Sequence, residues 1–235
     1  MKKNKWMLCV LVLTLAMVSG CQSKQEASAA DKMITVKDAK GEVAIPADPK
    51  RIVDLSGNSD ILSLLGYSVT GTANSDAYDY TRFPSYLQET LQGAKILGYS
   101  MQDSMDIEGI LELHPDLIII SGVQEKMYEQ LKEIAPTIMV ELAQTDWRQD
   151  VETFARMMQQ KERAAAWLKS YDEKAKKAGA AVRKANGEDA TYLALLASGG
   201  QLFVFDAAGN GRGVAPLFGV IFIKTTPVFF WDFLF

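Results

Sequence analysis

One cysteine stands where its thiol could be acylated. Cys21 ends the string Val18-Ser19-Gly20-Cys21, which follows a basic start and an apolar run over residues 6–18. A basic start, a short apolar run and small residues before a cleavage point are typical of a secretory signal. The run is shorter than the roughly 20 apolar residues that cross a bilayer. Because the string resembles a bacterial lipobox, we expect residues 1–20 to be removed as a lipoprotein signal peptide. Cys21 would then carry a lipid that anchors the protein at the extracytoplasmic face of the cell membrane.

Composition excludes some partners and kinds of site. Removing residues 1–20 takes away three lysines and no acidic residue, which changes the net charge from −4 to −7. A nucleic-acid partner requires a basic surface, so we expect none. No cysteine follows Cys21, so the exported part is expected to fold without disulfides. His114 is the only histidine, and a zinc site built from several imidazoles is therefore not expected.

Beyond a polar tether over residues 21–31, short apolar runs alternate with helical patterns. We expect strands at residues 33–36, 42–45, 51–55, 69–73, 116–121 and 137–140. We expect helices at residues 59–65, 106–113 and 124–134, and a short helix opened by Pro84. The run at 116–121 is continuously apolar, as in a strand that is covered on both faces. The alternation predicts an α/β lobe with a parallel sheet over residues 32–157.

The remaining sequence predicts a long helix and part of a second lobe. Helix-forming residues are almost unbroken from 148 to 186, and the part over residues 158–186 would bridge two lobes. Expected strands at 190–197 and 201–205 begin a second α/β lobe over residues 187–217. Residues 218–235 contain six of the ten phenylalanines without any helical or strand period. We therefore expect an α/β fold of two lobes, with the second incomplete and followed by an aberrant aromatic tail.

The loops after the expected strands hold the candidate binding residues. In open α/β sheets ligands bind beyond the carboxyl ends of the strands. In the first lobe this rule selects the loops that contain Asn58, Tyr99 and Trp147, and Tyr78 and Tyr80 lie on a neighbouring loop. In the second lobe it selects residues 198–201 and 206–212.

Four strings together resemble the siderophore-binding lipoproteins of bacterial ABC importers, especially those of the ferric-hydroxamate type. They are residues 45–53 (IPADPKRIV), 115–121 (PDLIIIS), 135–137 (APT) and 210–213 (NGRG). The resemblance covers about residues 33–217. It implies a periplasmic-binding-protein-like fold of the helical-backbone type, with the ligand in the cleft between two lobes. Members of that family continue through a full second lobe, so this chain resembles a truncated member and would be impaired as an importer subunit.

The resemblance also implies what the cleft binds. A ferric siderophore already coordinates its iron, so the protein supplies aromatic walls and cationic donors rather than metal ligands or a cofactor. Arg212 matches the family arginine that reaches the chelate oxygens, whereas Asn210 stands where the family often has an aromatic residue. The aromatic walls would come from the tyrosines and the tryptophan of the first lobe, which are Tyr78, Tyr80, Tyr99 and Trp147.

A further residue matches a family position that contacts the importer. Glu108 corresponds to a glutamate that related proteins set against an arginine of the ABC permease. The partners implied are therefore a ferric siderophore, the permease subunits and the lipid bilayer, with the chain itself a monomer.

Other functions stay open on the residues alone. The ligand could be another iron chelate, haem or cobalamin, and a truncated chain could be non-functional. A nucleotide-dependent enzyme is the alternative from another class, because residues 209–213 (GNGRG) follow an expected strand. The third glycine of a dinucleotide fingerprint would fall at 214, which is Val214, so the match is imperfect. We find no nucleophile elbow, zinc-protease motif or candidate nucleophilic cysteine, and expect no enzyme activity.

Overall fold

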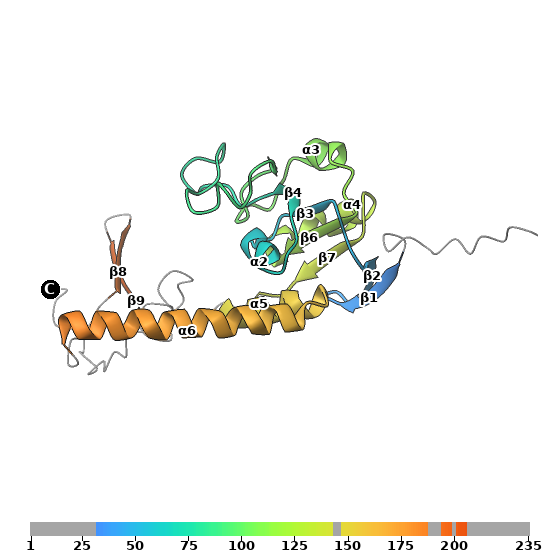
Figure 1. Cartoon of the computed structure of the whole chain (residues 1–235). Coiled ribbons are helices and arrows are strands. Elements are labelled where there is room, and N and C mark those ends of the chain that lie inside the picture. Colours follow the sequence, from blue (N-terminus) through green and yellow to red (C-terminus); the bar gives the residue numbers. More distant parts are fainter. Residues whose placement is uncertain (1–31, 143–146, 188–193, 199–200, 206–235) are drawn as a thin grey trace, which may run out of the picture.

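The apolar run around residue 118 forms the strand β6 (Leu117–Ser121) inside a five-stranded parallel sheet. The computed structural model describes residues 32–142, 147–187, 194–198 and 201–205 (Figure 1). The sheet has the order β5-β4-β3-β6-β7, and all neighbouring pairs are parallel. Its other strands are β3 (Ile52–Asp54), β4 (Val69–Thr72), β5 (Lys95–Ile96) and β7 (Thr137–Val140). The predicted α/β class is confirmed, and only β5 was not predicted.

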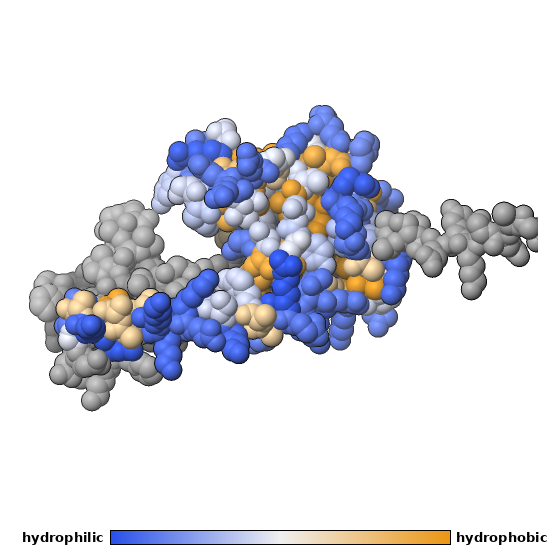
Figure 2. Space-filling view, in the orientation of Figure 1, coloured by the Kyte–Doolittle hydropathy of each residue, from blue (hydrophilic) through white to orange (hydrophobic). Residues whose placement is uncertain are grey.

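Both faces of the sheet are covered. Leu117 and Ile119 of β6 point into one core with α2 (Ser59–Leu64), whereas Ile118 and Ile120 point into the other core. The second core is closed by α3 (Ile107–Glu112), by the 3-10 helix η2 (Gly122–Met127) and by α4 (Tyr128–Lys132). Alternate side chains of one strand therefore enter different cores, which explains the continuous apolar run. Hydrophilic residues cover most of the face shown in Figure 2.

The predicted N-terminal hairpin covers the edge of the sheet. Its strands are β1 (Met33–Lys37) and β2 (Glu42–Pro46), joined by a turn at Asp38. In the edge strand β7, the backbone N–H of Met139 donates to Asp38 Oδ2 at 2.8 Å, and Ala39 N–H donates to Met139 O at 3.0 Å. These bonds satisfy polar groups that an open edge would leave unpaired.

The long helical pattern forms two helices, so the prediction of an almost unbroken helix was wrong at one point. Helix α5 (Trp147–Met157) ends before Gln159, whose φ of 55° lies in the left-handed region, and α6 (Lys161–Asn186) then begins. Both Met157 and Met158 are buried. The tyrosine hydroxyl of Tyr67 donates to Met158 O at 3.2 Å, and this contact fixes the break against the lobe.

Helix α6 leaves the lobe as a long arm (Figure 1). With 26 residues it is about 39 Å long at about 1.5 Å per residue. Its first turn is tied to α2, because Arg163 Nε donates to Leu64 O at 2.9 Å. The chain then reaches an antiparallel pair of strands, β8 (Ala194–Ser198) and β9 (Gln201–Phe205), which is the described part of the predicted second lobe.

Two further expectations concern local structure. The short helix predicted at Pro84 was wrong, because residues 85–93 form turns in which Leu87 N–H donates to Pro84 O and Leu91 N–H donates to Leu87 O. The helix predicted at 124–134 is a 3-10 turn followed by the short helix α4. Among the described helices, none is long and apolar enough to span a membrane.

Candidate functional site

The order of the strands gives the sheet a topological switch point between β3 and β6. The chain runs outward from β3 to β4 and β5, then returns to the other side of β3 and continues through β6 to β7. The loops after β3 and β6 therefore diverge at their carboxyl ends, and this point is where open α/β sheets bind ligands. These loops carry an extended polar network.

A buried carboxylate organises the loop after β3. Asp54 is fully buried, and its carboxylate accepts four hydrogen bonds. The donors are Ser56 N at 3.0 Å, Ser56 Oγ at 2.6 Å, Asn58 N at 3.0 Å and Ser59 Oγ at 2.6 Å. Burial raises the pKa of the Asp54 carboxyl, against the lowering effect of the hydrogen bonds from Ser56 and Ser59. The carboxylate holds the loop and the start of α2 in one conformation.

The network continues to the loop after β4. Ser59 Oγ lies 2.8 Å from Thr72 Oγ1, and Asn74 Oδ1 accepts the backbone N–H of Ser59 at 3.2 Å. The Asn74 side-chain amide donates to Gly57 O at 3.0 Å. Gly57 has a φ of 80°, and a Cβ there would lie 2.7 Å from the Ser100 side chain, so this tight approach of the loops favours glycine.

A buried glutamine joins the loop after β6 to the loop after β5. Gln124 Oε1 accepts from the backbone N–H and the hydroxyl of Ser121, at 3.1 and 3.0 Å. Its amide nitrogen donates to Ser100 O at 2.7 Å and to Gln102 O at 2.9 Å. Tyr99 lies directly before the bonded segment and pairs with Asn74 in an isolated β-bridge. Gln124 therefore fixes the backbone that presents Tyr99.

Tyr80 and Tyr99, two of the predicted wall residues, are brought together. Their rings are stacked with centroids 4.9 Å apart and an angle of 12° between the planes. Tyr80 is 45% exposed, and Tyr78 is 95% exposed. Tyr80 and Tyr99 therefore form an aromatic surface beside the loops at the carboxyl end of the sheet.

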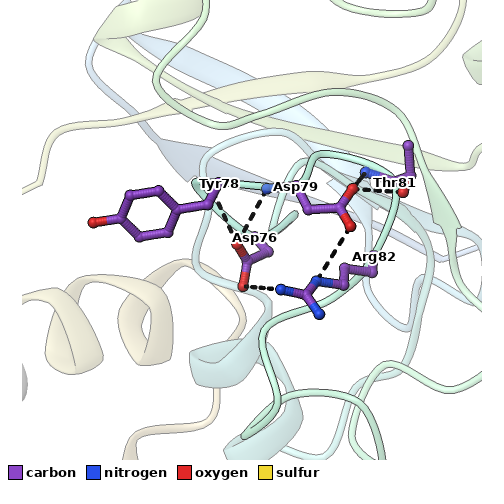
Figure 3. A network of polar contacts seen from close by, with 5 residues as sticks. All are labelled: Asp76, Tyr78, Asp79, Thr81 and Arg82. Atoms are coloured by element: carbon purple, nitrogen blue, oxygen red, sulfur yellow. Dashed lines mark hydrogen bonds and ion pairs between the residues drawn. The ribbon is translucent and has the colours of Figure 1, made fainter.

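The loop that carries Tyr80 is held by its own polar contacts (Figure 3). Asp76 Oδ1 accepts the backbone N–H groups of Tyr78 and Asp79, at 2.9 and 3.2 Å. Arg82 pairs with Asp79 at 3.4 Å and with Asp76 at 3.9 Å. The ring of Tyr78 points away from this network. Hydrogen bonds from Thr81 lower the pKa of Asp79.

Trp147 and Asn58 lie in different surroundings from the tyrosine pair. Trp147 packs edge-on against Trp167 and Tyr171 of α6, with centroids 6.1 and 5.0 Å away. Asn58 is fully buried, and its amide donates to the carbonyl and the hydroxyl of Ser56. The structure therefore places Asn58 inside the loop network rather than on the surface that Tyr80 and Tyr99 form.

The remaining candidates divide into one exposed residue and three that lie outside the described residues. Glu108 on α3 is exposed, and no ion pair or hydrogen bond of its carboxylate occurs within the described residues. Arg212, Asn210 and Cys21 lie outside the described residues. Within those residues, no three His, Cys, Asp or Glu side chains gather as a metal site.

Residues that sequence reasoning missed hold the site together. Asp54, Asn74 and Gln124 were not candidates, although each follows or ends a strand of the parallel sheet. The sequence feature that could have identified them is a polar residue at or just after the carboxyl end of an apolar run. Only the contacts between loops show that these three side chains connect the β3, β4, β5 and β6 loops.

Comparisons with known proteins identify the family of this chain. Residues 55–226 match the family model described as periplasmic binding protein. The probable siderophore-binding lipoprotein YfiY of Bacillus subtilis is 33% identical over 181 residues, which are 74% of this chain and 54% of that protein. The iron(3+)-hydroxamate-binding protein YxeB of the same species is 31% identical over 233 residues, 95% of this chain and 68% of that protein.

Comparison with solved structures gives a similar fold. The structure of unliganded FhuD2 from Staphylococcus aureus has a TM-score of 0.69 at 24% identity, covering 83% of this chain and 68% of that one. The chain thus spans between about half and two thirds of the length of these relatives.

Proposed function

This chain belongs to the periplasmic binding protein family, and from that premise we propose that it captures a ferric siderophore of the hydroxamate type and delivers it to an ABC permease. The match covers most of the chain, and the resemblance drawn from the four sequence strings is confirmed. Iron enters as part of the ligand, so the protein needs no metal ligands of its own. As a binding protein, the chain performs no catalytic step.

The stacked pair Tyr80–Tyr99 carries this proposal. A ferric siderophore presents bulky chelate rings, which bind to aromatic surfaces with a few positioned polar groups. The pair supplies such a surface next to the carboxyl ends of the parallel strands, and Gln124 and Arg82 fix the two loops before any ligand arrives. Preorganised walls reduce the cost of ordering side chains on binding. Arg212 is the proposed cationic donor to the chelate oxygens.

We expect ferric hydroxamates to quench the tryptophan fluorescence of the full chain saturably, and metal-free hydroxamates to bind more weakly. Arg212→Ala should weaken binding by about 1.5–3 kcal/mol, the cost of losing a hydrogen bond to a charged group. Tyr99→Ala should weaken it by about 0.5–1.5 kcal/mol, because the stacked surface is lost. Tyr99→Phe retains the ring and is the matched control.

Fluorescence titration of the wild type and of each variant gives the dissociation constants that test these expectations. Unchanged affinity in both alanine variants would remove these residues from the site. Parallel titrations with ferric citrate, a ferric catecholate, haem and cobalamin test the other ligand classes. Tighter binding of one of these would replace the hydroxamate while leaving the binding role intact.

We also propose that Cys21 anchors the protein through a lipid. Cys21→Ser should move most of the protein from the membrane fraction to the soluble extracytoplasmic fraction, because the acylated thiol is lost. Metabolic labelling with a fatty acid and immunoblotting of the fractions measure this change. Cys9→Ser is the matched control, because Cys9 lies inside the proposed signal peptide. Unchanged labelling of Cys21→Ser would exclude this cysteine as the lipid site.

Glu108 is the proposed contact with the permease. Its carboxylate is exposed and unpaired among the described residues, whereas Glu112 on the same helix pairs with Lys95 at 2.8 Å. Glu108→Ala should leave siderophore affinity unchanged and reduce iron uptake about tenfold, the effect of losing about 1.4 kcal/mol of docking free energy. Glu112→Ala is the control on the same helix. Normal uptake of radioactive iron by cells with Glu108→Ala would contradict the docking role.

A further inference from the structure

An open pocket lies between α2, the start of α5 and the first half of α6. Its volume is about 250 Å³, enough for a small organic group. The residues that line it are Asp60, Ile61, Leu64, Trp147, Val151, Trp167 and Tyr171. The pocket uses none of the loops that hold Tyr80 and Tyr99, and of the four predicted siderophore walls only Trp147 lines it.

Three aromatic rings form one side of the pocket. Trp167 and Tyr171 are four residues apart on α6, and their rings are stacked with centroids 5.4 Å apart and an angle of 21°. Trp147 meets both rings edge-on, at angles of 88° and 68°. Faces of Trp and Tyr attract cations because the ring quadrupole is negative over the face.

The chain itself shows that these rings accept a cation. The guanidinium of Arg148 lies 4.6 Å from the centroid of Trp147 and 5.4 Å from that of Tyr171. Its charge is balanced, because Asp172 pairs with it at 2.5 Å. Arg148 does not line the pocket, and Asp60 is the charged residue among the lining side chains.

Two polar atoms of the lining residues have unmet hydrogen-bonding capacity. Asp60 Oδ1 and the hydroxyl of Tyr171 are shielded from solvent and have no hydrogen-bond partner among the described residues. Burial raises the pKa of Tyr171, which keeps its hydroxyl neutral. A shielded oxygen without a hydrogen-bond donor is costly, and a bound cation or hydrogen-bond donor at Asp60 Oδ1 would remove that cost. An apolar occupant would leave Asp60 Oδ1 without a hydrogen-bond donor.

We propose that this pocket binds a small organic cation, an alkylated ammonium group, with the Asp60 carboxylate as its counter-ion and Trp147 and Trp167 as its walls. The volume suits one such group, and the rings and the carboxylate supply the two interactions that it requires. An acidic side chain next to aromatic faces also discriminates against neutral molecules of the same shape.

Choline and its neutral isostere 3,3-dimethyl-1-butanol are the probes for this test. Isothermal titration of the full chain should give saturable choline binding with a dissociation constant on the order of 1 mM, and the alcohol should bind at least about tenfold more weakly. Equal binding of the alcohol would show an apolar pocket and overturn the proposal. Absence of saturable choline binding would overturn it as well.

Two variants locate the binding in the pocket. Asp60→Asn should weaken choline binding about tenfold, and the partly exposed Trp167→Leu should weaken it about fivefold or more. Glu173→Gln, an exposed acidic position on α6 outside the pocket lining, is the matched control and should bind choline like the wild type. Circular dichroism confirms the fold of each variant, and Trp167→Leu decides if Asp60→Asn does not fold. Unchanged affinity in the folded variants would overturn the proposal.

Discussion

Replacing Phe154 with alanine should lower the free energy of unfolding of the described lobe by about 3–5 kcal/mol. Phe154 on α5 is 1% exposed and belongs to the core that joins α2, the sheet and the first turn of α6. Truncation removes the transfer free energy of the ring and leaves a cavity between these elements. Natural domains are stable by only about 5–15 kcal/mol, so this one change removes a large share.

Urea denaturation followed by circular dichroism measures the effect. Phe154→Leu keeps most of the buried volume and should cost less than half as much as alanine. Glu152→Ala on the exposed face of the same helix is the matched control and should change stability by less than about 0.5 kcal/mol. A loss below about 1 kcal/mol for Phe154→Ala would mean that α5 contributes little to the core.

Replacing Asp54 with alanine should cost about 3 kcal/mol or more, because several buried donors lose their acceptor together. The backbone N–H groups of Ser56 and Asn58 have no alternative partner in the described network, whereas Ser59 Oγ can still pair with Thr72. The loops at the β3–β6 switch point would lose their order, so the proposed siderophore affinity should fall with stability. Asp54→Asn keeps one acceptor oxygen and should cost less.

The stability difference between the wild type and Asp54→Asn should depend on pH. Burial raises the pKa of Asp54 above its ordinary value of 3.8 in the folded state. The unfolded chain therefore releases this proton first, and the contribution of Asp54 falls as the pH rises from 3.8 through the folded pKa. Urea denaturation at about pH 4 and about pH 7 should show a smaller wild-type advantage at the higher pH. An advantage that grows with pH would contradict a raised pKa.

The helix break shows where sequence patterns stop being informative. The residues Met158, Gln159 and Gln160 include neither proline nor glycine, so nothing in their types predicts an end to the helix. The break exists because Met157 and Met158 are both buried while α6 must leave the lobe in a new direction, and Gln159 takes a positive φ to allow this. That cost is offset by packing and by the contact of Tyr67 with Met158 O.

In the candidate site, too, the sequence predicted some features and only the structure showed others. Aromatic residues after strands were found from their types and positions, but composition could not show that Tyr80 stacks on Tyr99 whereas Trp147 packs on α6. Nor could it show that Asn58 faces inward. These outcomes depend on where loops from different strands meet, which is set by the strand order.

The sequence alone determined the α/β class, the N-terminal hairpin, most strands of the sheet and the family. The spacing of apolar residues along the chain indicates which side chains are buried. That spacing also distinguishes a strand from a helix. Tertiary structure alone decided the order β5-β4-β3-β6-β7, the bonds from Asp54 and Gln124 that join the loops, and the pocket beside Asp60. Each of these depends on contacts between residues distant in the chain, and the residue types of a single segment do not encode those contacts.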